Sequence, residues 1–117
     1  MGPVPDTRRF RSDLEMLARR IERRAGERLP ASRLQPLIDG LTELYMSGAV
    51  KINHSAMELV VAAHLMMRGY LVDVEVEVGD LRCDVMGTGG DRVIVEVETG
   101  FVPPDHALDP GSFCRAR

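Results

Sequence analysis

Apolar residues recur at helical spacing through the first half of the chain and at alternate positions through much of the second half. The helical spacing predicts three helices, which run from about Asp6 or Thr7 to Ala25, from Ala31 or Ser32 to Met46, and from near Ser55 to just before Gly69. At the start of the third helix, Ser55 and Glu58 have the spacing of a capping box. This helix is apolar nearly all round, so we expect it to be buried between layers.

Strict alternation then predicts three strands joined by tight turns. From Leu71 onward the inward face takes valines and the outward face takes Asp73, Glu75 and Glu77. Gly79-Asp80 supplies the first turn, and the glycines from 87 to 90 supply the second. In the last strand the valines at 93, 95 and 97 lie on one face, whereas Glu96 and Glu98 lie on the other.

The order of these elements predicts an α+β fold, in which a buried helix packs on a three-stranded antiparallel meander and is preceded by two further helices. Residues 1–50 form an arginine-rich helical extension, and residues 51–117 form the core with a proline-rich tail. Pro3 and Pro5 predict an irregular start over residues 1–6. No further periodic segment follows Gly100.

The composition narrows the class of protein. With 117 residues, of which 44% are apolar and 28% charged, the chain suits one modest core, and its longest apolar run is too short to span a bilayer. The N-terminus lacks the basic and apolar segments of a signal peptide. Two cysteines do not make a disulfide framework, and Cys83 falls on the apolar face of its strand, so we expect a buried thiol and a cytoplasmic protein.

Charge is distributed unevenly along the chain. Residues 1–33 carry nine arginines against five acidic residues, whereas the remainder carries six basic against thirteen acidic residues. The outer face of the first helix therefore offers candidates for contacts with nucleic-acid phosphates, namely Arg8, Arg9, Arg19, Arg20, Arg23 and Arg24. The alternative is a solvated face paired with Glu15, Glu22 and Glu27.

The stretch from Asp84 to Glu98 is the strongest candidate for chemistry. If the two strands pair around Gly89, Asp84 lies near Ile94 and one diagonal step from Glu96, so that three carboxylates share one surface. Like charges this close are unfavourable unless a cation lies among them. The cluster is therefore a candidate site for a hard, oxygen-preferring ion such as Mg²⁺.

The residues from Asn53 to Gly100 resemble the restriction endonuclease-like nuclease superfamily, and within it the archaeal Holliday junction resolvases. The matching pieces are the helix bearing Glu58, the helix end Arg68-Gly69-Tyr70, the acidic strand, Asp84 and the strand end from Val95 to Gly100.

The resemblance implies Mg²⁺-dependent cleavage of a phosphodiester, with Mn²⁺ able to replace Mg²⁺. Glu58 would be the acid on the helix, Asp84 the metal-bridging aspartate and Glu96 a further metal ligand. Glu98 stands where the family normally has a lysine, and these four acids are the candidate catalytic residues. The family core also continues with a helix and a strand that the tail is too short to supply. Either a partner chain completes the core, or the chain is a truncated or diverged form.

Together these features predict a metal-dependent endonuclease acting on DNA, including structured or branched DNA, with RNA left open. The alternatives are a nuclease-fold module that no longer cuts and binds nucleic acid or protein, and an unrelated small α+β interaction protein. An exposed sheet edge and the apolar third helix also predict a two-fold homodimer.

Each candidate residue has a simpler interpretation. Glu58 can merely cap its helix, and Asp84 can be an ordinary acid near a turn. Glu96 and Glu98 can lie on a solvated strand face. His54, one turn before Glu58, either reaches the same site or is an exposed residue at the helix start. His64 lies inside an apolar helix, so we expect a hydrogen-bonded core residue.

Overall fold

The computed structural model describes residues 6–98 and the backbone of a short strand at 114–116. The expected irregular segment before residue 6 and the proline-rich part of the tail lie outside the described residues. Three helices, α1 (Thr7–Ala25), α2 (Gln35–Met46) and α3 (Ile52–Met67), precede the strands β1 (Leu71–Val78), β2 (Leu81–Thr88) and β3 (Arg92–Val97). The predicted α+β class and antiparallel meander are confirmed.

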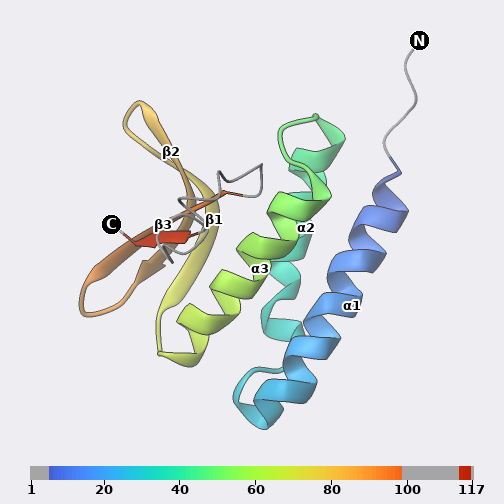
Figure 1. Cartoon of the computed structure of the whole chain (residues 1–117), viewed down its shortest axis with the longest axis horizontal. Coiled ribbons are helices and arrows are strands. Elements are labelled where there is room, and N and C mark those ends of the chain that lie inside the picture. The colour runs from blue at the N-terminus through green and yellow to red at the C-terminus, as the bar shows by residue number, and fades with distance from the viewer. Residues whose placement is uncertain (1–5, 99–113, 117) are drawn as a thin grey trace, which may run out of the picture.

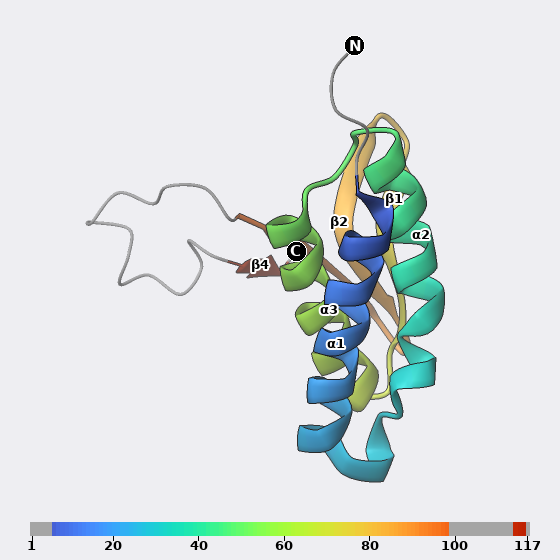
Figure 2. The ribbon, with the colours of Figure 1, turned by 90° about the vertical axis from the view of Figure 1, so that its right-hand side faces the viewer.

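The helices pack together on one face of the sheet. Figure 1 shows α3 between the sheet and α1, and the quarter-turn view in Figure 2 shows the sheet behind the three helices. One hydrophobic cluster joins all these layers, from Phe10 and Leu14 on α1 through Ile38 on α2 and Leu59 on α3 to Val85 on β2. No helix among residues 6–98 is both long and apolar enough to cross a membrane.

The bounds of α1 follow the predicted signals. Phe10, Leu14 and Ala18 form its buried stripe, at the spacing of one helical face. The Asp6 side chain accepts a hydrogen bond from the Arg9 backbone N–H at 3.1 Å, which caps the first turn. Gly26 ends the helix with φ 67°.

The predicted second helix is divided in the structure, because Ala31–Arg33 form a 3₁₀ turn and the α-helix begins only at Gln35.

The predicted capping box at Ser55 is wrong, because α3 begins at Ile52 and Lys51 occupies the N-cap without a side-chain hydrogen bond. Val50 is buried and Ile52 packs against the core, which draws the chain into the helix one turn early. Ser55 and Glu58 are thereby placed inside the helix, where both are fully buried.

The strands follow the order β1-β2-β3-β4, with a fourth strand, β4 (Cys114–Ala116), that the alternation did not predict. Val74 pairs with Val85 and Val85 pairs with Val95, which places three valines across the centre of the sheet. The predicted pairing around Gly89 is wrong by two residues, because Ile94 pairs with Met86 rather than lying near Asp84.

The shifted register has a local cause. Strand β2 continues through Gly87 to Thr88, so the turn falls at residues 89–91. A side chain at 87 would lie 3.3 Å from atoms of Leu65 and Tyr70, and glycine lets the strand approach α3 this closely. The continued strand brings Asp84 beyond the last pair of the ladder, at the end where β2 and β3 separate.

The end of α3 gives a stability prediction. Gly69 has φ 94°, a left-handed conformation that turns the chain from α3 into β1. Gly69→Ala should lower the free energy of unfolding by roughly 1–2 kcal/mol, because a Cβ is unfavourable at this φ. Gly40→Ala, inside α2 with open space around its Cβ, is the matched control and should raise it by up to about 1 kcal/mol. Urea unfolding measures both, and equal shifts in one direction would contradict this account.

Candidate metal centre

Four ionisable side chains converge where α3 lies against β1 and β2. His54 and Glu58 lie one turn apart on α3, and their side chains approach to 3.1 Å between His54 Nε2 and Glu58 Oε1. The same His54 nitrogen lies 3.4 Å from Asp84 Oδ1 on β2. On β1, Glu75 lies opposite Asp84, between the pairs Val74–Val85 and Val76–Cys83.

The backbone holds two of these carboxylates in place. Asp84 Oδ2 accepts a hydrogen bond from the Val97 backbone N–H at 2.7 Å, where β2 and β3 separate. Glu75 has φ 52° and is the one non-glycine residue between 6 and 98 with a positive φ. Such a conformation costs roughly 1–3 kcal/mol and occurs mainly at functional sites.

The structure overturns the outward orientation predicted for Glu75. Its side chain is only 6% exposed, and its Oε1 lies 3.4 Å from an Arg82 nitrogen. The alternation rule fails because the positive φ interrupts the ladder at this residue, leaving it unpaired between two normal pairs. The predicted pattern holds better elsewhere on β1, where Val72 and Val74 pack against the core.

Of the four side chains, Glu58 has the environment least favourable to its ionised form. It is fully buried, and within residues 6–98 neither carboxylate oxygen makes a hydrogen bond of normal geometry, although His54 Nε2 lies 3.1 Å from Oε1. Burial, together with the neighbouring charges of Glu75 and Asp84, raises the pKa of Glu58 to about 9. Burial also raises the pKa of Glu75, although Arg82 opposes this shift.

This arrangement can hold a metal ion. One ligand atom each from His54, Glu75 and Asp84 lie within 4.8 Å of one another. Glu58 adds a third carboxylate, from α3, beside this group. A cation within the group would favour the ionised carboxylates, whose mutual repulsion and burial are otherwise unfavourable.

The sequence-predicted residues divide into two groups. Asp84 and Glu58 lie in the cluster, and the interpretation of Glu58 as a helix cap is wrong because it lies inside α3. Glu96 is half-buried on β3 and Glu98 is exposed just after this strand, and neither belongs to the metal-competent group among the described residues.

Two site residues were misjudged or missed from the sequence. His54 reaches the site, so its interpretation as an exposed residue at the helix start is wrong. Glu75 was missed, yet the Gly79-Asp80 turn carried the signal, because counting outward from that turn places Glu75 opposite Asp84. Nothing in the sequence indicates that the Glu75 side chain turns inward.

The remaining predictions concern the helix surfaces. The six candidate arginines on α1 are exposed, and residues 6–98 provide no ion pair for any of them. Two of the three predicted acidic partners are engaged elsewhere, since Glu22 accepts from the Ala31 N–H and Glu15 from Gln35. His64 is exposed rather than in the core. Cys83 is a buried free thiol, as predicted.

Comparisons with known proteins give no relative. No family model, curated protein or solved structure matches the chain.

The raised pKa of Glu58 predicts how stability depends on pH. Without metal, the folded protein keeps a proton on Glu58 that the unfolded chain releases above about pH 4.5, so stability falls as pH rises from there towards 9. Glu58→Gln removes this titration and should be more stable than the wild type at pH 8, by on the order of 2–4 kcal/mol. Urea unfolding with a chelator present, at pH 5 and pH 8, measures the difference.

The difference between variant and wild type should shrink at pH 5. Glu77→Gln, at an exposed glutamate on β1, is the control and should leave the pH dependence unchanged. A Glu58→Gln protein that is less stable than the wild type at pH 8 would show that Glu58 is ionised and well solvated.

Proposed function

We propose that this chain is a divalent-metal-dependent nuclease that hydrolyses phosphodiester bonds in DNA, including structured or branched DNA. The observation that carries the proposal is the convergence of the fully buried Glu58 carboxylate with Glu75, Asp84 and His54. The three acids share one imidazole and one arginine, and an excess of buried negative charge is expensive unless a cation lies among the carboxylates.

The donor set bears on the choice of cation. Mg²⁺ prefers oxygen ligands throughout, whereas imidazole nitrogen suits later first-row ions, and carboxylates also bind Mn²⁺ well. Three carboxylates with one imidazole therefore favour Mn²⁺ over Mg²⁺. A bound divalent cation would activate water for attack on phosphorus and neutralise the charge that builds up on the phosphate oxygens.

The chain's own residues position the ligand atoms. The Val97 N–H fixes Asp84 through Oδ2 and thereby leaves Oδ1 directed towards His54. His54 is a quarter exposed, so it is the member of its pair with Glu58 that solvent and substrate reach.

The arginines of α1 support a nucleic-acid substrate. They form an exposed stripe without ion pairs among residues 6–98, which suits contacts to phosphates. Figure 1 places α3 between α1 and the sheet, so these arginines lie one helical layer away from the acidic cluster. We therefore assign Arg8, Arg9 and Arg19 to flanking phosphates rather than to the phosphate being cleaved.

One observation favours the alternative, a nuclease-fold module that binds without cutting. Within residues 6–98, the only arginine paired with the cluster is Arg82, which is already bound to Glu75, and Glu98, at the position of the expected lysine, lies outside the cluster. Both versions of the proposal place the protein in the reducing cytoplasm, and the buried free thiol of Cys83 supports this location.

Cleavage assays test the nuclease. With Mn²⁺, the wild type should cut at least one of supercoiled plasmid, linear duplex and four-way-junction DNA. Asp84→Asn should lower the rate by about a hundredfold, about 2.7 kcal/mol of barrier, whereas the exposed Glu77→Gln control should keep it. Cleavage that survives Asp84→Asn unchanged would point to a contaminating enzyme.

Calorimetry with Mn²⁺ tests the metal centre that the nuclease requires. The ion should bind, and Glu58→Gln should weaken its binding at least about tenfold. Mn²⁺ binding without cleavage would favour the module that binds without cutting, and no Mn²⁺ binding at all would contradict the nuclease.

We also propose that the chain forms a two-fold homodimer. Strand β1 is paired on one side only, and it carries Leu71, which is 75% exposed, while Leu81 at the start of β2 is 72% exposed. Open edges with exposed leucines favour pairing with a second copy.

Sedimentation tests the dimer. At micromolar concentration the wild type should have twice the chain mass of 13.0 kDa, and Leu71→Arg/Leu81→Arg should shift it to the monomer. Met46→Arg, at an exposed position on α2, is the control that should leave the dimer intact. A wild-type monomer at high micromolar concentration would rule the dimer out.

A further inference from the structure

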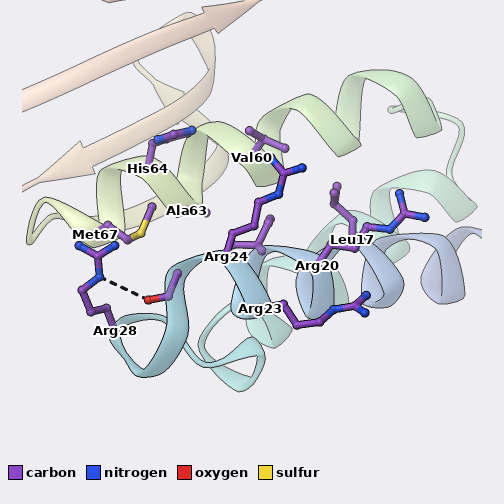
Figure 3. Close-up of a pocket in the computed structure, with 11 residues that line it drawn as sticks. Leu17, Arg20, Arg23, Arg24, Arg28, Val60, Ala63, His64 and Met67 are labelled. Atoms are coloured by element: carbon purple, nitrogen blue, oxygen red, sulfur yellow. Dashed lines mark hydrogen bonds between the residues drawn. The ribbon is translucent and has the colours of Figure 1, made fainter.

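A groove lies between the C-terminal half of α1 and the C-terminal half of α3, as Figure 3 shows. Its volume is about 560 Å³, within the range of small-molecule sites. The apolar part of its lining comes from Leu17, Ile21, Val60, Ala63 and Met67. The polar part comes from four arginines and a histidine, namely Arg20, Arg23, Arg24, Arg28 and His64.

The charge around this groove has one sign. Among residues 6–98, no acidic residue lines it, and Arg20, Arg23 and Arg24 have no ion pair. The nearby acid on α1, Glu22, is held by the Ala31 N–H at 2.6 Å. Arg28 donates through Nε to the Ala25 carbonyl oxygen at 3.3 Å, which anchors its guanidinium at the rim.

We propose that this groove binds an amphiphilic anion, a small molecule with an apolar chain and a phosphate or carboxylate head. An alkyl chain would cover the exposed apolar floor, and this burial of apolar surface is favourable. The arginine rim can bind the head group through paired N–H groups. A nucleic-acid backbone would use the rim and leave the apolar floor in water. Both parts of the groove are used only by a ligand that combines them.

This site is separate from the metal centre. Val60, His64 and Met67 recur on one side of α3, and Val60 follows Glu58 by two residues, a rotation of about 200° around the helix. The groove therefore opens on roughly the opposite face of α3 from the carboxylate cluster. The proposal does not depend on nuclease activity.

Calorimetry with alkyl phosphates below their micelle-forming concentration tests the site. Decyl phosphate should bind one to one, with a dissociation constant on the order of 10–100 μM. Affinity should rise about twofold to fourfold for each methylene added between hexyl and decyl phosphate, because the floor covers the chain. Decanol and inorganic phosphate, each carrying half of the ligand, should bind at least about tenfold more weakly.

Variants assign the binding to the groove. Arg20→Gln/Arg24→Gln should weaken decyl phosphate at least about tenfold. Arg33→Gln/Arg92→Gln removes the same charge at two exposed positions outside the groove, and should change affinity less than about twofold. Val60→Trp fills the groove without changing charge and should abolish binding, with circular dichroism confirming that each variant is folded.

The opposite results would overturn the proposal. They are equal losses in both arginine pairs, affinity independent of chain length, or binding that survives Val60→Trp. Binding to anionic vesicles or a short DNA duplex, unaffected by Val60→Trp and without binding of monomeric decyl phosphate, would assign the arginines to a membrane or nucleic-acid surface instead.

Discussion

The double packing of α3 is the constraint on which the rest of the structure depends. This helix contacts α1 and α2 on one side and the sheet on the other, and it supplies Leu59, Ala62 and Ala63 to the common core. Because the helix is enclosed, any polar group on its inner face must be compensated locally. Glu58 lies on that face without hydrogen bonds. The acidic cluster is thus a consequence of where α3 is packed.

The candidate metal centre destabilises the fold without a ligand in two ways. Burial and the repulsion of neighbouring carboxylates raise the pKa of Glu58, and Glu75 has a left-handed backbone conformation within a strand. A protein with so small a core has little stability to spare. An arrangement that weakens the fold without a ligand and is relieved by a cation is characteristic of a binding site, where function and stability oppose each other.

The sequence predicts the elements well and the site only in part. Helix ends at Gly26 and Gly69 could be predicted because glycine is the residue that tolerates the positive φ found there. The start of α3 could not, since the signal of Ser55 and Glu58 competed with the burial of Val50, and burial decided the outcome. The turn after β2 was misplaced because four clustered residues, Gly87 to Gly90, offered several turns with similar local signals.

His54 and His64, both on α3, differ in whether the sequence alone could have placed them. His54 could have been placed from its spacing to Glu58 alone, because residues four apart share a helix face. His64 could not, because α3 is apolar on every side and the sequence does not say which side remains uncovered. Only packing decides that the sheet covers the face of Glu58 and that α1 covers the opposite face incompletely, leaving the groove.

The uneven charge of the chain has a structural counterpart in the two faces of α3. Acids from the second half of the sequence gather on the side of the sheet, whereas arginines from the first half line the side of α1. Helix α3 lies between the two groups, so the charges nearest to each group are mainly its own. One helix therefore presents a candidate cation site and a proposed anion site on opposite faces. Because they share no side chain, either can be changed by mutation while the other keeps its geometry.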